Sequence, residues 1–402
     1  MFDNGQVFSF DKGHTKKEMK KNYDLIVIGS GSIGVPVALE FAKRGQSVLV
    51  IDSLPSPGQG QDKKAIGGIR ATHSDKGKIA VSQRSIEIFS HWEETYGDDI
   101  QWQSNGYSFP AYTEEDEKTL KDLMKIQQSD GLNIHWVSPE EYRDLNPGIN
   151  MQGLRGSTYS PEDGSASPLL FINSCHFKAV DAGAEFKFNE KVTGFQIKKN
   201  QIASVRTNKG TYHSTNVLNA AGAYAKEVSQ LVGIDTPVDP DSHEAGISEP
   251  VKPFMGPMVV DIRMEPGSRS LYFYQNTIGH VVFCLTSDVP IWGIDNRATS
   301  SFLPIIARRM IKLIPMLANL KVRRTWRGQY PNTPDGFPIV GKTRELDNFY
   351  QAVGMCGQGF MLGPGLAELV YRLITESYTP DDLEVLKSFD PYRDFKGREM
   401  FK

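Results

Sequence analysis

The sequence has few cysteines, no long apolar run and almost no net charge. Its three cysteines, Cys175, Cys284 and Cys356, are far apart and form no CxxC pair, so we expect neither a disulfide framework nor a metal or iron–sulfur site. Lysine and arginine (45) nearly balance aspartate and glutamate (48), and no basic block interleaves with aromatic residues, which argues against nucleic-acid binding. No run of about 18 apolar residues occurs, so we expect no membrane-spanning helix.

The first residues and the apolar run after them need a separate explanation. Four lysines within residues 16–21 precede the run YDLIVIGSGSIGVPVALEFA, as in a signal peptide. Three glycines and a proline interrupt the run, however, and Glu40, Lys43 and Arg44 follow in place of a small-residue cleavage site. We therefore predict a cytoplasmic protein with an N-terminal extension over residues 1–22. The length of 402 residues allows two domains.

Residues 23–52 have the pattern of a dinucleotide-binding βαβ unit. The run YDLIVI predicts a buried parallel strand, GSGSIG follows it at once, VPVALEFAKRG predicts a helix, and a second strand, SVLVID, ends at Asp52. In this pattern the first glycine permits a tight turn, the second lets the backbone approach a pyrophosphate, and the third lets helix and strand pack closely. The predicted cofactor contacts are Gly29, Gly31, Ser32, Ile33, Gly34, Asp52 and Ser53.

The carboxylate at position 52 narrows the choice of cofactor. Asp52 can accept hydrogen bonds from both hydroxyls of an unphosphorylated adenosine ribose, which favours NAD or FAD over NADP. The loop alone does not distinguish NAD from FAD. No further βαβ unit follows; instead a Gly/Pro-rich segment runs from Ser53 to Asp75, and loops of this length within a compact domain are usually functional.

The rest of the chain combines helices with antiparallel strands. Residues 258–300 alternate apolar and polar side chains, which predicts an antiparallel sheet. Residues 184–222 predict a strand, a β-meander with turns near Gly194, Asn200 and Gly210, and a buried strand that ends in NAAG. Ser138 and Glu141 predict a capping box at the start of a short helix. Further helices are predicted over residues 76–97, 114–130, 169–180 and 303–317.

Five stretches in this order resemble motifs of the D-amino-acid oxidase/sarcosine oxidase family of FAD-dependent oxidoreductases. They are GSGSIG with Asp52, GGIRATHS (67–74), NAAGAYA (219–225), TWRGQYPNTPDGFPIVG (325–341) and GMCGQGFMLGPG (354–365). Within the family, the sequence is most similar to sarcosine oxidase β-subunits and L-proline dehydrogenase catalytic subunits. The resemblance covers nearly all of residues 23–380 and implies FAD as the cofactor.

The resemblance implies an α/β (α+β) fold with two domains. A Rossmann-like FAD-binding domain, with a βαβ unit of the glutathione-reductase type, would comprise residues 23–100, 161–235 and 331–390. A substrate-binding domain, built on an antiparallel sheet flanked by helices, would comprise residues 101–160 and 236–330. In this arrangement the antiparallel sheet covers the flavin.

The resemblance also implies cofactor contacts outside the first loop. Residues 58–69 would follow the pyrophosphate and the ribityl chain, Val192 would bring its backbone to the adenine, and NAAG would close around the nucleotide or else simply be a tightly packed strand end. The second glycine-rich loop would direct backbone N–H groups and the dipole of a helix over 364–375 at the pyrimidine edge of the flavin, favouring the anionic reduced form. The implied contacts are Gly67, Gly68, Ile69, Val192, Ala220, Ala221, Gly222, Gly328, Gly357, Gln358, Gly359, Phe360 and Met361.

A substrate carboxylate would be bound most naturally by an arginine fork. Arg70 is the first candidate, because the resemblance places an arginine of this segment beside the flavin; the alternative is a structural ion pair. Arg327 is a second choice. Tyr272 and Tyr274 share one face of a strand, which is either the flavin side or core. His73 could deprotonate the substrate ammonium or contact the flavin, or it could be a buried structural histidine.

Departures from the family pattern narrow the chemistry. Gly328 stands where some members carry a flavin-bound cysteine, and Pro168 stands where others carry a histidine that binds FMN covalently, so we expect non-covalent FAD. The strand HVVFCLT lacks the lysine that several oxygen-reactive members place over the flavin, and Met361 stands where one subgroup has lysine. These absences favour a dehydrogenase.

The resulting prediction is FAD-dependent oxidation of a secondary or N-methylated amino acid, such as sarcosine or proline, by hydride transfer to flavin N5 with formation of an imine. The alternatives are oxidation of a 2-hydroxy acid or a glycerol phosphate, and a non-catalytic flavoprotein subunit of a complex. The resemblance implies partner subunits, because the most similar family members work beside other subunits. Since this chain lacks cysteines for an iron–sulfur cluster, we expect the partners to carry Fe–S or a second flavin. Cys356 is more simply explained as a small buried side chain than as a redox group.

Overall fold

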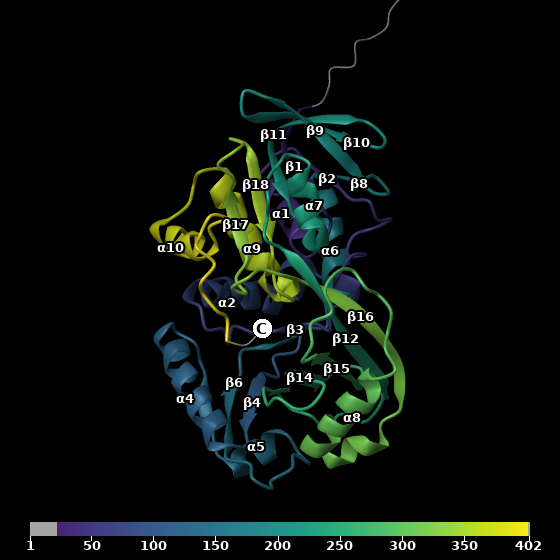
Figure 1. Ribbon diagram of the computed structural model, residues 1–402, viewed down its shortest axis with the longest axis vertical. Helices are drawn as coiled ribbons and strands as arrows, with labels where there is room; N and C mark the ends of the chain where they lie inside the picture. Colours follow the sequence, from purple (N-terminus) through teal and green to yellow (C-terminus); the bar gives the residue numbers. More distant parts are fainter. Residues whose placement is uncertain (1–21, 401–402) are drawn as a thin grey trace, which may run out of the picture.

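The computed structural model describes residues 22–400 and contains two eight-stranded sheets (Figure 1). The first sheet, in the upper half of the figure, has the order β17-β18-β11-β1-β2-β8, and β10 and β9 continue from β11. Apart from its last residue, the expected N-terminal extension lies outside the described residues. The strands of the first sheet are β1 (Asn22–Ile28), β2 (Val48–Ile51), β8 (Glu185–Lys187), β9 (Val192–Lys198), β10 (Gln201–Thr207), β11 (Thr211–Asn219), β17 (Ile339–Lys342) and β18 (Phe349–Val353).

The second sheet lies in the lower half of Figure 1 and has the order β16-β12-β15-β14-β13-β4-β6-β5. Its pairs are antiparallel except for β13 with β4. A separate two-stranded sheet joins β3 (Gly68–Ile69) to β7 (Gly164–Ser165). The strands of the second sheet are β4 (Tyr107–Ala111), β5 (His135–Val137), β6 (Gly156–Ser160), β12 (Asp239–Pro250), β13 (Met258–Asp261), β14 (Ser270–Gln275), β15 (His280–Thr286) and β16 (Val322–Asn332).

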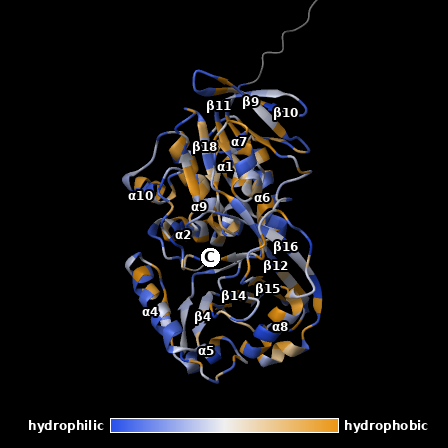
Figure 2. Ribbon diagram, viewed as in Figure 1, coloured by the Kyte–Doolittle hydropathy of each residue, from blue (hydrophilic) through white to orange (hydrophobic). Residues whose placement is uncertain are grey.

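Helices pack against both sheets: α1, α6 and α9 against one face of the first sheet, and α8 against one face of the second. Figure 2 shows α4 and α8, at the outside of the lower half, in bands of blue and orange, as expected of helices with one apolar side. None of the helices within residues 22–400 combines the length and apolarity that crossing a membrane requires. The helices are α1 (Gly34–Ala42), α2 (Lys76–Ser90), α3 (Trp92–Tyr96), α4 (Glu114–Ser129), α5 (Pro139–Leu145), α6 (Pro168–Asp181), α7 (Ala225–Gln230), α8 (Phe302–Leu313), α9 (Gly359–Ile374) and α10 (Pro380–Phe389), with 3-10 turns η1 (Asp62–Lys64), η2 (Gly222–Tyr224) and η3 (Pro315–Asn319).

The first sheet is buried on both faces. In β1, Leu25 and Val27 pack into the core formed with α1, α6 and α9, while Ile26 and Ile28 pack into the core on the opposite face. A strand with both faces buried must be continuously apolar, which is why YDLIVI lacks polar alternation beyond its start. The mixed α/β fold confirms the fold class predicted from the sequence.

The second sheet separates two different cores. Phe273 and Phe283 point to the face covered by α8, whereas Tyr274 and Cys284 point to the opposite face together with Ile66. Ile66 belongs to the long segment that follows β2, so this opposite face meets the first half of the molecule. The strands of the two sheets come from the ranges expected for two domains except at the first residue of β1 and the end of β16. The domain boundaries themselves stay a prediction.

Three predicted boundaries differ from the structure. The helix expected over 76–97 breaks at His91 into α2 and α3, and Gly194 lies inside β9 and is not a turn. The helix expected from residue 364 begins at Gly359, so the second half of the glycine-rich loop is helical and Pro364 lies within α9. The capping box of α5 is present as predicted: the Glu141 N–H donates to the Ser138 hydroxyl, and the Ser138 N–H donates to the Glu141 carboxylate.

Candidate functional site

The GSGSIG loop joins the carboxyl end of β1 to the start of α1. Gly29 has a φ of +109°, and a Cβ there would lie 2.5 Å from the carbonyl oxygen of Ala220. A Cβ on Gly34 would overlap the carbonyl oxygen of Gly29. At Gly31 a Cβ would lie 2.8 Å from Oδ2 of Asp62. Gly29 and Gly34 therefore have the steric roles predicted for them, and Gly31 opens towards a carboxylate that the motif did not indicate.

Asp52 follows β2 and organises the same sheet edge. Its Oδ2 accepts hydrogen bonds from the N–H and the hydroxyl of Ser30, both at 2.7 Å, and its Oδ1 accepts one from the Leu54 N–H at 2.8 Å. The Glu190 N–H donates to the carbonyl oxygen of Asp52 at 2.9 Å, which brings the nearby start of β9 at Val192 to this edge. The predicted ribose ligand and the predicted adenine contact thus lie at the carboxyl ends of the parallel strands, where nucleotides bind in such sheets. Ser53 follows Asp52 and is exposed.

The NAAG segment ends β11 at the same edge. The Ala220 N–H donates to the carbonyl oxygen of Ile28 at 2.9 Å, and the carbonyl of Ala220 lies against Gly29. Ala221 leads into η2, where Gly222 has a φ of +55° and, apart from its two neighbours in the chain, no described residue has an atom within 4 Å of a Cβ built on it. Ala220 is tightly packed, whereas Gly222 faces open space, and the contact of NAAG with the nucleotide stays a prediction.

Gly67 and Gly68 follow the long Gly/Pro-rich segment and contact the rest of the protein. A Cβ on Gly67 would overlap the carbonyl oxygen of Ala166, and a Cβ on Gly68 would overlap the hydroxyl of Tyr107 on β4. The predicted reason for these glycines was close approach to the cofactor. The structure supplies a different physical reason, which is close packing against β4 and the segment after β7.

The second glycine-rich loop leads directly into α9. Cys356 and Gly357 have φ values of +50° and +82°, and a Cβ on Gly357 would lie 2.5 Å from the ring of Tyr330. Gln358 is buried, and neither its amide nitrogen nor its amide oxygen has a hydrogen-bond partner among residues 22–400. Buried polar atoms are nearly always hydrogen-bonded, so Gln358 together with the free N–H groups of Gly359 and its neighbours points to a ligand at this end of α9.

The amino ends of α1 and α9 meet. A Cβ on Gly363, in the second turn of α9, would overlap the carbonyl oxygen of Ser32. The Ser32 hydroxyl is buried and has no hydrogen-bond partner within the described part of the chain. Both glycine-rich loops therefore present helix N-termini and unsatisfied polar atoms to one region, which is the donor set that a long anionic dinucleotide requires.

Several predicted contacts have side chains that belong to the hydrophobic core. Ile33, Ile69 and Phe360 are buried in the core between the first sheet and its helices, and Met361 packs against it. These residues can therefore contact the cofactor only through their backbone atoms. Val192 likewise contributes its side chain to the core on the other face of the first sheet.

Arg70 follows β3 and is buried. Its guanidinium donates a hydrogen bond to the carbonyl oxygen of Thr72, and its charge acts to lower the pKa values of Tyr107 and Asp163. The Ala71 N–H donates to Oδ1 of Asp163 at 2.8 Å. Burial nevertheless raises the pKa of Asp163 to about 7. Arg70 thus lies between the nucleotide-binding segments and β4, and its role as the carboxylate ligand stays a prediction.

His73 is fully buried beside α2. Its Nε2 lies 3.0 Å from the hydroxyl of Ser82. Burial, and then the charges of Arg70 and Lys78, hold the pKa of His73 well below its usual range. A neutral imidazole with so low a pKa is a poor acceptor for the proton of an ammonium group. The structure therefore favours the structural interpretation of His73.

The tyrosines of β14 face the nucleotide-binding segments. The hydroxyls of Tyr272 and Tyr330 lie 2.7 Å apart, and Tyr274 donates a hydrogen bond to the carbonyl oxygen of Ile66. Burial raises the pKa of Tyr272 and of Tyr330 well above the usual value. Tyr330 also touches Gly357, as described above, so it connects β14 to the second glycine-rich loop. Sequence reasoning missed Tyr330, although it lies in a quoted motif.

Arg327 is on the other face of the same sheet. Its guanidinium pairs with Glu244 at 3.1 Å and with Asp295 at 3.2 Å. In the sheet register, Glu244 stands opposite both Arg327 and Leu285, and Leu285 belongs to the core under α8. These ion pairs favour a structural role for Arg327, and its role as a second carboxylate ligand stays a prediction. Gly328 points the opposite way, where a Cβ would lie 3.1 Å from Cβ of Lys64 in the long segment that follows β2.

A buried ion pair next to Arg70 and His73 was not predicted. Lys78 on α2 and Glu399 near the carboxyl end lie 3.0 Å apart, and both side chains are completely buried. The hydroxyl of Ser74 donates to the other oxygen of Glu399 at 3.1 Å. Figure 1 shows the yellow segment after α10 running back between the two halves of the molecule. No sequence pattern connects Lys78 to Glu399, because they are far apart in the chain.

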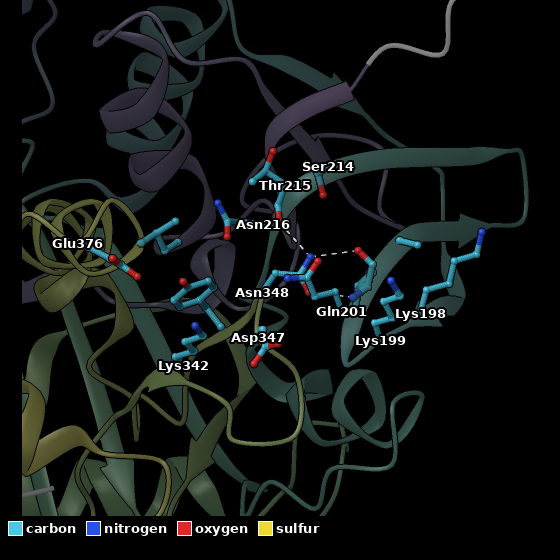
Figure 3. A pocket seen from close by; sticks show the side chains of 14 residues that line it. Lys198, Lys199, Gln201, Ser214, Thr215, Asn216, Lys342, Asp347, Asn348 and Glu376 are labelled. Atoms are coloured by element: carbon cyan, nitrogen blue, oxygen red, sulfur yellow. Dashed lines mark hydrogen bonds between the residues drawn. The ribbon is translucent and has the colours of Figure 1, made fainter.

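A cavity of about 520 Å³ lies at the opposite edge of the first sheet (Figure 3). It is lined by the start of β11, including Thr215, and by the β9–β10 turn, including Lys199. The side-chain amide of Asn348 lies at this cavity and donates hydrogen bonds to the carbonyl oxygens of Ile202 at 3.0 Å and Thr215 at 2.9 Å. Ligands of such sheets bind at the carboxyl ends of the parallel strands, so this cavity is not the nucleotide site.

Comparison with known proteins agrees with this geometry. The chain is 33% identical to L-proline dehydrogenase from P. horikoshii. The match covers 94% of this chain and 100% of that one, with a TM-score of 0.87. It is 25% identical to sarcosine oxidase subunit beta from an Arthrobacter species, over 87% of this chain and 86% of that protein. It is 24% identical to the mitochondrial sarcosine dehydrogenase of Mus musculus over 90% of this chain, which spans 40% of that longer protein. Residues 24–373 match the family described as FAD dependent oxidoreductase (DAO), and with the two converging loops this shows that the chain belongs to that family and binds FAD.

Proposed function

We propose that this protein oxidises the CH–NH bond of a secondary or N-methylated amino acid, such as sarcosine or proline, to an imine. FAD, when bound, accepts the hydride from the α-carbon. The observation that carries the proposal is Arg70, a buried cation between the FAD-binding segments and β4. The names of the sarcosine- and proline-oxidising relatives support the choice of substrate class.

The residues of both loops fit FAD. The N–H groups before α1 would hold the diphosphate, Asp52 would accept the ribose hydroxyls, and Gln358 with the first N–H groups of α9 would bind the polar edge of the flavin. We propose that the binding is non-covalent, because Gly328 has no side chain to attach it and all three cysteines are buried and free.

The protein has to bind the substrate and hold its α-carbon in place, with little proton transfer of its own. Arg70 would pair with the substrate carboxylate through two hydrogen bonds, which orients the α-carbon as well as binding it. Tyr272 and Tyr330 stay protonated because burial raises both pKa values, so they can donate hydrogen bonds but do not act as bases. The imine leaves the site and hydrolyses in water.

The test is the anaerobic loss of flavin absorbance with a panel of substrates. Sarcosine, proline and N-methylated amino acids should bleach the flavin, and lactate and glycerol 3-phosphate should not. Arg70→Met should lower kcat/KM by roughly 100- to 1000-fold, the effect of removing one partner of a buried charge pair, with flavin content unchanged. Arg323→Met, at an exposed position on β16, is the control and should behave as the wild type.

Two results would contradict the proposal. Unchanged kcat/KM in Arg70→Met would remove Arg70 as the carboxylate ligand. Bleaching by hydroxy acids alone, or by no small molecule at all, would favour the alternative reactions or a non-catalytic role. Admission of air after bleaching distinguishes an oxidase from a dehydrogenase. The reduced flavin of a dehydrogenase should reoxidise only slowly in air, and the absence of a lysine at position 361 suggests this outcome.

We also propose that the protein works in the cytoplasm beside other subunits that carry Fe–S or a second flavin. One relative is itself named as a subunit, and Cys175, Cys284 and Cys356 are too dispersed to hold a cluster on this chain. Size-exclusion chromatography of the native protein, with iron and flavin analysis of the peak, tests this. A homogeneous peak at the mass of this chain or its multiples, with one flavin per chain, would contradict it.

A further inference from the structure

The carboxylate of Asp62 lies at the amino end of α1. Asp62 is buried, and its Oδ1 accepts a hydrogen bond from the Ser32 N–H at 3.2 Å. Its Oδ2 lies over Gly31, where a Cβ would approach it to 2.8 Å. In the GxGxxG pattern the second glycine leaves room for a pyrophosphate. The side chain of this chain's own Asp62 therefore occupies the place where the diphosphate of FAD is expected.

An ionised carboxylate and a diphosphate compete for the same donors. Within the described part of the chain, α1 has no side-chain cap and no acidic residue in its first turn, so its N–H groups and dipole are available to one anion. Two anions held close together in a buried site repel each other strongly. The diphosphate can bind beside Asp62 at low cost only if the carboxyl group is neutral.

The charged groups around Asp62 do not stabilise its ionised form. It faces Asp52, which lies at the end of β2 and is also acidic. Burial, with a smaller contribution from repulsion by Asp52, raises the pKa of Asp62 to about 7, and the hydrogen bond from the Ser32 N–H opposes this rise only in part. The neighbouring lysines point elsewhere: Lys63 contacts Gln59, and Lys64 contacts residues of the second half of the molecule. The side chain of Asp62 can thus take up a proton near neutral pH.

We propose that Asp62 is a proton-dependent ligand of FAD: before FAD binds, it is a carboxylate that accepts a hydrogen bond from the Ser32 N–H, and with FAD bound it is a neutral acid that donates its O–H to a phosphate oxygen. One proton is then taken up with each FAD near neutral pH, and FAD affinity falls as the pH rises. This inference rests on FAD as the cofactor and is independent of which substrate is oxidised. Through Asp62, the fraction of the protein that has FAD bound would depend on pH.

The first test is the dissociation constant of FAD for the apoprotein, measured by quenching of flavin fluorescence from pH 6 to pH 8. For one linked proton with a pKa near 7, the dissociation constant should rise about tenfold over this range. Asp62→Asn should bind FAD with the same affinity at both pH values, and at pH 8 at least as tightly as the wild type. A flat profile in the wild type would overturn the proposal.

Asp163 supplies a matched control. Burial raises its pKa to about 7 as well, but its Oδ1 accepts from the Ala71 N–H, away from α1. Asp163→Asn should keep the pH dependence that Asp62→Asn loses. The opposite result, with the dependence lost in Asp163→Asn and kept in Asp62→Asn, would assign the proton to Asp163 and overturn the proposal.

ADP-ribose distinguishes the two ends of the cofactor, because it carries the diphosphate without the flavin. Its affinity should show the same pH dependence as that of FAD, and a pH-independent affinity for ADP-ribose would overturn the proposal. If Asp62→Asn does not fold, calorimetry of the wild type decides the question. Titrations at pH 7.5 in two buffers of different ionisation enthalpy should reveal uptake of most of one proton per FAD, and no uptake would refute it.

Discussion

Each of the two glycine-rich loops leads into a helix, α1 or α9, but the N-termini of these helices have different surroundings. Before α1, the Ser32 N–H is already bonded to Asp62. At α9, Gln358 is buried with its amide unsatisfied among residues 22–400, and within these residues no side chain caps the helix. The first helix end carries an anion of its own, and the second is open.

This difference predicts different responses of the two helix ends to FAD. A carboxylate near α1 satisfies a donor in the empty protein but has to be neutralised when the diphosphate arrives. The polar groups of Gln358 have no substitute partner, and a buried unsatisfied amide costs free energy that a ligand can recover. We therefore expect FAD to stabilise the α9 end more than the α1 end.

The largest effect is expected where the two helix ends touch. In Gly363→Ala the new Cβ would overlap the carbonyl oxygen of Ser32, and both groups belong to rigid backbone. Overpacking of this kind lowers the free energy of unfolding by about 1–3 kcal/mol, although alanine favours a helix. Thermal unfolding of the apoprotein measures the loss, and FAD affinity should fall with it.

Gly210→Ala is the control for this overlap, because the nearest atom to its Cβ, the Tyr212 hydroxyl, would be 3.8 Å away. Its melting temperature should match that of the wild type. Equal stability of Gly363→Ala and Gly210→Ala would show that the contact between α9 and Ser32 is looser than described.

The next effect sharpens the difference between the two helix ends. Gln358→Leu removes two unsatisfied polar atoms from a buried position, so the apoprotein should become as stable as the wild type or more stable. The same change removes hydrogen bonds to the flavin, each worth about 1 kcal/mol, and should weaken FAD binding roughly tenfold. Thermal unfolding of the apoprotein measures the change in stability, and FAD titration measures the loss of affinity.

Gln351→Leu is a matched comparison, because this buried glutamine is fully engaged with Asn219, Ser229 and Thr236. It should destabilise the apoprotein by about 1–3 kcal/mol, since it leaves buried partners unsatisfied. A loss of apoprotein stability in Gln358→Leu as large as in Gln351→Leu would mean that Gln358 has a structural partner.

The smallest effect is expected at Cys356, within the second loop. Its sulfur donates to the carbonyl oxygen of Gly354 at 3.2 Å and accepts from the Thr333 N–H at 3.4 Å, contacts that a serine hydroxyl can also make. Cys356→Ser should retain the flavin content and activity of the wild type, and acid precipitation should release FAD from both proteins. Flavin that stays on the wild-type protein and is released from the variant would show a covalent bond to Cys356.

Local patterns made the first loop predictable. Gly29, Gly34 and Asp52 have positions dictated by neighbouring residues in the chain, since the turn, the helix start and the following strand are all within about thirty residues. Tyr272 and Tyr274 were expected on one face because strand geometry alternates. The ion pairs of Arg327 could not be predicted locally, because Glu244 and Asp295 come from distant segments of the chain.

The sequence by itself determined the family, the cofactor and the presence of a helix at each glycine-rich loop, because these depend on short motifs whose glycines are required by backbone geometry. Only the tertiary structure decided which side chains share the site. Asp62 comes to α1, Tyr330 to Gly357, and Glu399 to Lys78 by packing between segments that no local pattern connects. Burial then sets their charge states, because desolvation acts on a carboxyl or an ammonium group only after the whole fold has enclosed it.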